Sequence, residues 1–402
     1  MRAARVALAF AAAALALACA PAAAQKQYGP GVTDTEIRIG QTMPYSGPVS
    51  ALGALGHSAV AYFAKVNAEG GINGRKVNLI SLDDAYSPPK TVEHTRRLVE
   101  QDKVLAIFQT LGTATNASIH KYLNQQKVPH LLITSGANRC ADPKNFPWTM
   151  SGMPSYDTEA RIYARYILER VPNARIAVLS QNDDFGRDYL SGFEAGLGAR
   201  AKAMIVARAT YEPTDPTVDS QIAALKASGA DVFFTISNGK FTSQSIRKSA
   251  ELGWKPVTFL PIGSSSIAGI LKPAGVERAT GAITAAYAKN PSDPQWADDP
   301  GMKEYFAFMK QYMPNADPLD SLNASGFNAG RLMAHILRAC GDNLTRENVM
   351  KQALSLKDFS TPLFLPGVTA STSPTDYAPF QQLRLSRFDG TSWVPFGDVI
   401  SR

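Results

Sequence analysis

The chain has 402 residues, of which 45% are hydrophobic and 19% charged, and its formal net charge is +7 at pH 7. This is a globular composition, and the length suggests roughly two to three domains with a large core that needs no metal or disulfide. Acidic and basic residues are interspersed without a long run of like charge, which argues against a nucleic-acid-binding protein.

The first residues, 1–24, predict a secretory signal peptide. Two arginines precede an apolar run over 6–20 that is too short to span a bilayer comfortably, and an Ala-x-Ala site ends at Ala24. The alternative is a lipoprotein signal acylated at Cys19, but Leu17 lies one position late for that signal. We therefore expect a cleaved, exported protein, with a net charge of +5 after two arginines are removed from +7.

The remaining sequence contains no motif for a metal site or a catalytic centre. Cys140 and Cys340 are far apart in sequence, so their spacing does not indicate whether they pair, and the five histidines are scattered. The segment "GSSSIAG" lacks the spacing of a nucleophile elbow, and no phosphate-binding or dinucleotide-binding glycine motif is present. We expect no enzyme activity, no metal and no cofactor.

Strands and helices alternate along most of the chain. Short Val/Ile/Leu-rich runs, such as "EIRIGQTM" (36–43) and "RIAVLSQ" (175–181), predict parallel strands buried on both faces. Two consecutive blocks of this alternation predict two open α/β sheets flanked by helices. After about residue 280 the order changes to helices and then a hairpin that turns at Asp389-Gly390. The expected helices cover residues 52–68, 89–102, 115–126, 157–170, 187–199, 217–228, 240–252, 300–313, 319–341 and 345–356.

Polar loops follow several of the expected strands, among them "MPYSGPVSALG", "TLGTATN", "TSGAN", "QNDDFG", "SNGKFT" and "IGSSS". In open α/β sheets, ligands bind outside the carboxyl ends of the strands, where such loops lead into helix N-termini. Glycine lets the backbone approach a ligand closely, and Ser and Thr add hydroxyl groups to the unpaired N–H groups of the next helix. This combination suits a carboxylate or another small anion without a basic side chain.

The segments "IRIG…MPYSGP", "NAEGGINGRKV", "DDAYSPPK", "LLITSGAN" and "NDDFGRD" resemble, in the same order, the periplasmic leucine/isoleucine/valine-binding family of ABC transporter solute-binding proteins. The resemblance implies a type I periplasmic binding protein fold. In this fold, two Rossmann-like α/β lobes with open, mainly parallel sheets are joined by three crossover strands. The implied lobes are 28–148 plus 280–360 for the first and 150–276 plus 375–402 for the second.

The resemblance also implies the function and the partners. The protein would capture a small organic solute by hinge closure and deliver it, as a monomer, to an inner-membrane ABC permease with its ATPase subunits. Branched-chain amino acids are the ligands of the named family. Aromatic or aliphatic carboxylates, small amides and a sensor acting through a separate receptor are the alternatives.

By motif matching, the carboxylate of the ligand is expected at Gly112-Thr113-Ala114 and at Gly136-Ala137-Asn138. Leu52 and Phe185 match two aromatic positions that pack on the ligand in the family. The complete set of expected ligand contacts is Ser46, Leu52, Thr113, Ala114, Gly136, Ala137, Asn138, Tyr156, Asp184, Phe185, Asn238, Gly263 and Ser264.

The main departure from the family lies at Gly263-Ser264, where amino-acid-binding members place an acidic residue that pairs with the ligand ammonium. An ammonium left without an anion in a closed, desolvated cleft costs several kcal/mol. Either Asp183 or Asp184 replaces this acid, or the ligand is not an α-amino acid. Asp83-Asp84 is a third candidate, but the commoner role of such a pair is capping and loop hydrogen bonding.

Two further features concern packing. The family's small disulfide is missing, because Tyr86 and Leu111 occupy its positions. The four tryptophans, Trp148, Trp254, Trp296 and Trp393, are expected to pack in the core or at the hinge rather than against the ligand.

Overall fold

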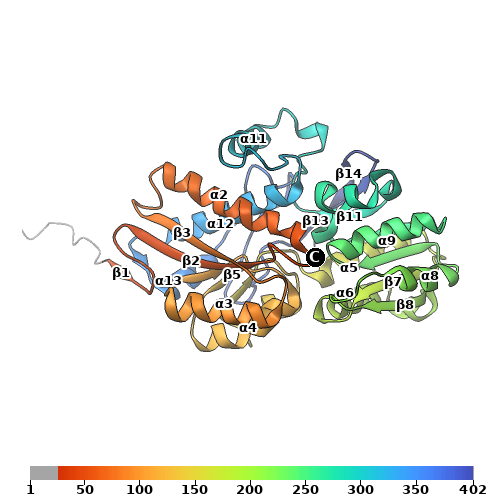
Figure 1. Ribbon diagram of the computed structural model, residues 1–402, viewed down its shortest axis with the longest axis horizontal. Helices are drawn as coiled ribbons and strands as arrows, with labels where there is room; N and C mark the ends of the chain where they lie inside the picture. Colours follow the sequence, from red (N-terminus) through yellow and green to blue (C-terminus); the bar gives the residue numbers. More distant parts are fainter. Residues whose placement is uncertain (1–25, 402) are drawn as a thin grey trace, which may run out of the picture.

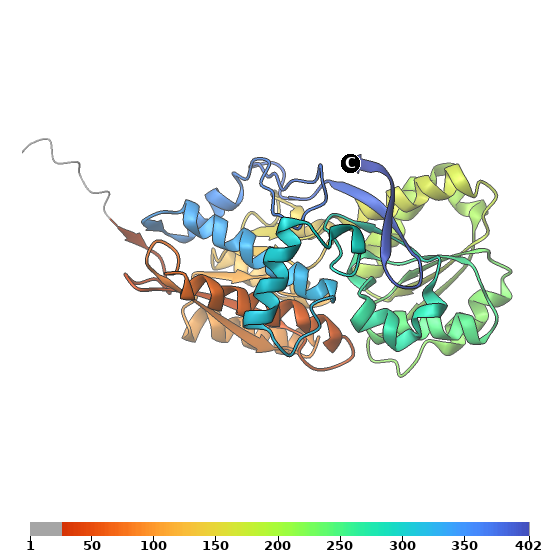
Figure 2. The same ribbon diagram turned by 90° about the horizontal axis from the view of Figure 1, so that it is seen from above.

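The computed structural model describes residues 26–401; the expected signal peptide (1–24), with its alternative acylation site at Cys19, lies outside the described residues. Two α/β lobes lie side by side, and several segments of the chain pass between them (Figures 1 and 2). Each lobe has its own sheet, and within each sheet most neighbouring strands are parallel. The predicted fold class is confirmed.

The first lobe is built on an all-parallel sheet of five strands. In spatial order they are β3 (Lys76–Asp83), β2 (Glu36–Met43), β4 (Ala106–Phe108), β5 (His130–Ile133) and β6 (Thr149–Ser151). The helices of this lobe are α2 (Ala54–Ala68), α3 (Pro88–Arg96), α4 (Thr113–Gln125), α11 (Pro300–Tyr312), α12 (Ser321–Ala339) and α13 (Arg346–Ala353). A short parallel pair of strands, β1 (Gln27–Tyr28) and β12 (Asn343–Leu344), joins the beginning of the described chain to the segment between α12 and α13.

The second lobe is built on a seven-stranded sheet. In spatial order its strands are β14 (Trp393–Ser401), β13 (Gln382–Phe388), β11 (Ile283–Ala286), β10 (Val257–Phe259), β9 (Val232–Ile236), β7 (Ile176–Gln181) and β8 (Ile205–Tyr211). Its helices are α5 (Tyr156–Arg170), α6 (Asp184–Leu197), α7 (Ala201–Met204), α8 (Asp219–Ala227), α9 (Lys240–Glu251) and α10 (Lys272–Ala274). The predicted C-terminal hairpin is confirmed as β13 and β14, whose last pair before the turn is Phe388 and Trp393.

Polar residues start several of the helices, at or within a few residues of the predicted boundaries. Ser155, Asp183, Asp299, Asp320 and Thr345 each accept a hydrogen bond through the side chain from a backbone N–H of the first helical turn. These N–H groups have no partner within the helix, so a side-chain acceptor stabilises the start of each helix by about 1 kcal/mol.

The second of the three segments that cross between the lobes, the one after β11, lies later in the chain than expected. The sequence placed residues from 280 onward in the first lobe, whereas Ile283 pairs with Phe259 of β10 and with Arg387 of β13 in the second sheet. The chain then leaves the second lobe after Ala286. The difference has a physical reason: β11 is held by a strand about a hundred residues further along the chain, and no local pattern reveals such a pairing.

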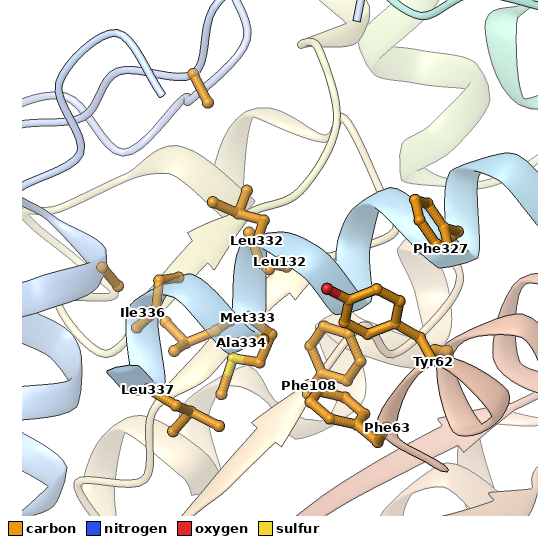
Figure 3. Packing of buried hydrophobic residues seen from close by; sticks show 14 of the residues in the cluster. Tyr62, Phe63, Phe108, Leu132, Phe327, Leu332, Met333, Ala334, Ile336 and Leu337 are labelled. Atoms are coloured by element: carbon orange, nitrogen blue, oxygen red, sulfur yellow. The ribbon is translucent and has the colours of Figure 1, made fainter. Parts of the chain in front are cut away.

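The core of the first lobe forms where α12 packs against α2 (Figure 3). The rings of Tyr62 and Phe327 meet edge to face with their centroids 5.1 Å apart. Gly326 and Gly330 allow this close approach. A Cβ on Gly326 would overlap the carbonyl oxygen of Leu55, and one on Gly330 would lie 2.7 Å from Tyr62 Cδ1.

The two cysteines and the membrane-spanning potential of the helices complete the description of the fold. Cys140 and Cys340 are both buried and free, so they do not form a disulfide. Within residues 26–401, no helix has both the length and the apolar character needed to cross a membrane.

Two histidines lie inside the first lobe, His120 on α4 and His130 on β5, with ring centroids 5.3 Å apart. Burial lowers the pKa of His120 to about 3, with a smaller contribution from Arg139. Burial also lowers the pKa of His130. Because the unfolded chain takes up these protons near pH 6.5, the free energy of unfolding falls as the pH decreases below that value.

We predict that His120→Leu is less sensitive to acid than the wild type. Neither ring nitrogen of His120 has a hydrogen-bond partner among the described residues, so an apolar side chain of similar size loses no bond. As the pH decreases from 6 to 4, the free energy of unfolding should fall more steeply for the wild type than for His120→Leu, and the two slopes should differ by about 1.4 kcal/mol per pH unit. Urea denaturation of both proteins at several pH values measures this difference, and equal slopes would contradict it.

Candidate ligand-binding cleft

A cavity lies between the two lobes and extends beneath the segments that cross between them. Its volume is about 150 Å³, which is room for a small organic molecule. Both lobes and all three crossings contribute to its wall, for example Leu52 and Phe185 from the lobes and Met153, Tyr287 and Phe380 from the crossings. The cavity is therefore where a ligand would contact both lobes at once.

The structure places the expected contact residues in two groups. Those that line the cavity are Leu52, Thr113, Tyr156, Phe185, Asn238 and Gly263. Those that do not are Ser46, Ala114, Gly136, Ala137, Asn138, Asp184 and Ser264.

Ser46 belongs to the loop after β2, and this loop is attached to the end of the neighbouring strand β3. Ser46 Oγ donates to Asp83 Oδ2 at 2.6 Å, and the backbone N–H groups of Tyr45 and Ser46 donate to Asp83 Oδ1 at 3.0 and 3.2 Å. Met43 and Asp83 are directly paired in the sheet, which brings the carboxylate beneath the loop. The Ser46 hydroxyl therefore holds the loop rather than facing the cavity.

Gly263 and Ser264 lie in a 3-10 turn, η5 (Ile262–Ser264). Gly263 faces the cavity, whereas Ser264 is fully buried and its Oγ donates to the carbonyl of Ser237 at 2.6 Å. The position at which the resemblance implies an acid in amino-acid-binding members thus presents only backbone to the cavity.

None of the acidic residues that the sequence offered as a replacement, Asp183, Asp184 and the pair Asp83-Asp84, lies on the cavity wall. Both carboxylate oxygens of Asp183 are used at the start of α6, where Oδ1 accepts from Phe185 N–H at 3.0 Å and Oδ2 accepts from Gln181 Nε2 at 2.6 Å. Asp184 forms ion pairs of 2.7 Å with Arg139 and 2.5 Å with Arg187. Both carboxylates are thus engaged outside the cavity.

One end of the cavity meets the start of α4. Thr113 Oγ1 lies 2.9 Å from Ser135 Oγ and 3.2 Å from the hydroxyl of Tyr156, so three hydroxyl groups gather beside the first helical turn. Gly112, which precedes the helix, has φ +103°, and a Cβ there would lie 2.5 Å from Thr115 Oγ1. With no side chain capping this helix start, its N–H groups and positive dipole end suit an anion.

Aromatic and aliphatic side chains make up most of the remaining wall near α4. On the second lobe, Tyr156 stacks on Tyr189 with centroids 4.3 Å apart, and Phe185 meets both rings edge to face. On the first lobe, Tyr86 and Leu111, the positions of the missing family disulfide, pack in one apolar cluster that also contains Leu52, Leu55 and Leu322.

The charged side chains on the wall, among the described residues, are Lys289 and Asp293, and both have partners. Lys289 Nζ contacts Asp299 Oδ2 at 2.6 Å and donates to the carbonyl of Pro362 at 2.8 Å. Asp293 accepts hydrogen bonds from the backbone and side chain of Gln295. The same part of the chain contains no group of three His, Cys, Asp or Glu side chains placed to hold a metal ion.

Several wall residues were not expected from the sequence. Tyr189 lies one helical turn after Phe185, so helical spacing was a signal that could have indicated it. Gln109 follows β4 directly and could have been found from its place at the carboxyl end of that strand. Trp296 and Trp393, expected in packing roles, also line the cavity, and Trp393 Nε1 donates to the carbonyl of Ser265 at 2.7 Å.

The two lobes touch around the cavity. Arg139 of the first lobe pairs with Asp184 of the second, and the Asn138 N–H donates to Asp188 Oδ2 at 3.0 Å. On another side, Ser266 Oγ donates to Asp320 Oδ1 at 2.8 Å in a buried contact. The lobes are therefore in a closed arrangement.

A buried carboxyl group supports the second-lobe wall from behind. Glu159 on α5 accepts hydrogen bonds from the hydroxyls of Tyr163 and Tyr189 at 2.6 and 2.7 Å and from Ile262 N–H at 2.8 Å. Burial raises the pKa of Glu159 to about 7 against these hydrogen bonds. Glu159 thus positions two parts of the wall, Tyr189 and the turn at Ile262.

Replacing Glu159 by Gln should keep an acceptor for Ile262 and remove the titration. The folded wild type holds this proton up to about pH 7, whereas an unfolded glutamate releases it near pH 4.5. The wild type therefore loses stability as the pH rises through this window, and Glu159→Gln does not. When the pH rises from 4 to 8, the free energy of unfolding of the wild type should decrease by roughly 3 kcal/mol relative to that of Glu159→Gln. Parallel pH profiles in denaturation experiments would contradict this assignment.

Two α/β lobes closed around a ligand-sized cavity define a bilobal binding protein. A family model for periplasmic binding proteins matches residues 36–392, and the chain belongs to this family. The predicted resemblance to the leucine/isoleucine/valine-binding proteins is confirmed by the relatives that match. The chain is 23% identical over 253 residues to a Leu/Ile/Val-binding protein homolog 7 of Brucella abortus, a match that covers 60% of this chain and 62% of that protein. The aligned region spans 53% to 62% of the length of the first curated relatives that it matches.

Solved structures show the same fold. A branched chain amino acid ABC transporter protein from Thermus thermophilus with bound valine superposes with a TM-score of 0.82 at 17% identity, covering 92% of this chain and 98% of that one. A fatty acid ABC transporter substrate-binding protein from Thermomonospora curvata superposes with a TM-score of 0.75 at 20% identity, covering 94% and 95%.

Proposed function

We propose that the protein is the periplasmic solute-binding component of an ABC importer, and that its solute is a carboxylate without an α-ammonium group. The carrying observation is the composition of the cavity wall, in which helix N–H groups and hydroxyls stand at one end and no unpaired acidic side chain is present among the described residues.

The argument against an ammonium is electrostatic. A buried ammonium needs an anion or several acceptors, because its desolvation costs several kcal/mol. Gly263 takes the place of the family's acid, and Asp183 and Asp184 are engaged elsewhere. A carboxylate alone makes no such demand, since Thr113 and the first N–H groups of α4 supply its donors.

The comparisons are compatible with either ligand class. The Thermus thermophilus protein holds valine, and the Thermomonospora curvata protein is named for fatty acids, which carry a carboxylate and no ammonium. The fold therefore accommodates both classes, and the residues on the wall favour the second for this chain.

A binding screen with the purified protein tests the proposal. Thermal unfolding is measured with amino acids, aliphatic acids, aromatic acids and amides, and a ligand at 100 times its Kd adds about 2.7 kcal/mol of stability. Stabilisation by acids without an amino group is expected, with a loss of at least tenfold in affinity for Thr113→Val. Stabilisation by leucine, isoleucine or valine alone would overturn the ligand class.

Closure of the two lobes on the ligand is part of the same proposal. Ion pairs such as Arg139–Asp184 join the lobes only when they are together, so they favour the closed state without touching the cavity. A ligand that contacts both lobes shifts the same equilibrium.

Arg139→Gln should therefore weaken ligand binding severalfold, and the effect should fade at high salt, since this pair is partly exposed. The matched control is Arg187→Gln, which removes a cation from the same carboxylate but within α6 of the second lobe. Titration calorimetry with the best acid from the screen measures both variants. Equal losses in the two variants would contradict a role of the pair between the lobes.

A further inference from the structure

Beyond the carboxylate end, the cavity continues into an inner chamber, defined here by Ala286, Tyr287, Asn328, Ala329, Leu332 and Phe364. This part of the wall comes from one face of α12 and from the segments that cross between the lobes. We propose that the inner chamber takes an elongated apolar tail, so that the solute is an alkyl or arylalkyl carboxylate rather than a short acid. This inference rests on the proposed carboxylate function.

The first argument for an elongated tail is the length of the cavity along α12. The wall includes Ser321 at the start of this helix and Leu332 three turns later, with Ser325, Asn328 and Ala329 on the same face between them. At a rise of 1.5 Å per residue, this face is about 16 Å long. An extended chain advances by about 1.2 Å per bond, so the face matches roughly a dozen bonds. A branched-chain amino acid spans only the outer part of such a cavity.

The side chains of the inner chamber suit an apolar tail. Small residues on two elements of the wall, Ala286 at the end of β11 and Ala329 on α12, leave space that larger side chains would fill. Three rings complete the chamber: Tyr287 and Phe380 have centroids 4.8 Å apart, and Phe364 and Phe380 have centroids 5.4 Å apart. Leu332 belongs to the same wall, and it packs in the first-lobe core with Leu132 (Figure 3).

Two polar groups lie on the wall of the inner chamber, and one of them, Asn328, comes before Leu332 along α12. Asn328 is 94% buried, and its Oδ1 accepts from Thr361 Oγ1, while its Nδ2 has no partner among the described residues. Trp296 Nε1 on the same wall also has none in that part of the chain. Methylene groups placed against unpaired donors add little stabilisation, so the gain per carbon should be smaller where the tail meets them.

The test is a chain-length series of straight-chain carboxylates from acetate to decanoate, measured by calorimetry on the wild type. Each methylene that enters the inner chamber should increase affinity by about fourfold until the tail reaches Asn328. Ala329→Phe fills the chamber at a distance from the carboxylate end. Relative to the wild type, this variant should lose at least tenfold more affinity for the long acids than for the short acids.

Two further variants keep the test decisive. Val60→Phe, on the exposed face of α2, is the matched control and should behave as the wild type. Ala286→Leu fills the chamber from another element, β11, and serves if Ala329→Phe does not fold. Affinity that is independent of chain length, or an equal loss for short and long acids in the filled variants, would overturn the inference while the carboxylate function stands. Failure of every acid to bind would instead overturn the carboxylate function itself.

Discussion

The close contact between α12 and α2 is the constraint on which the arrangement of the cavity depends. Gly326 and Gly330 remove the side chains that would hold the two helices apart. The contact buries the aromatic core around Tyr62 and Phe327, and it sets α12 along one side of the cavity. At the start of the same helix, Asp320 both caps the first turn and accepts the hydroxyl of Ser266 from the other lobe. One helix thus connects the core, the cavity wall and the contact between the lobes.

The electrostatics of the cavity follow from how its charged neighbours are used. Asp83, Asp183 and Asp184 stand near the strand ends where a ligand site forms, but each is occupied with backbone N–H groups or arginines. What remains for a ligand is neutral: hydroxyl groups, backbone N–H groups and the positive end of α4. Such donors stabilise a carboxylate, and they give an ammonium no counter-charge. The selectivity proposed for this protein therefore arises from where its acids are engaged rather than from how many it has.

Much of the fold could be predicted because its signals are local. The strand at Glu36–Met43 and the C-terminal hairpin were expected from hydrophobic runs and an Asp-Gly turn, and both are present. The site was predicted less completely. Thr113, Tyr156 and Phe185 do line the cavity, whereas Ser46 and Ser264 carry the right chemistry on loops but use their hydroxyls within their own lobes. Sequence motifs identify a loop near a site, but they do not indicate which side chains of that loop are already bonded.

The sequence by itself determined the family, the two α/β lobes and the absence of an acid at Gly263-Ser264, because these depend on residue order and local periodicity. Only the tertiary structure decided whether Asp183 or Asp184 reaches the cavity, since even the local hydrogen bonds of Asp183 have no sequence signature and the Arg139 partner of Asp184 comes from a distant segment. It likewise decided that Trp296, Phe364 and α12 share one wall. These residues meet because β11 pairs with a strand from the end of the chain and the crossing segments fold over α12, and neither contact has a local signature.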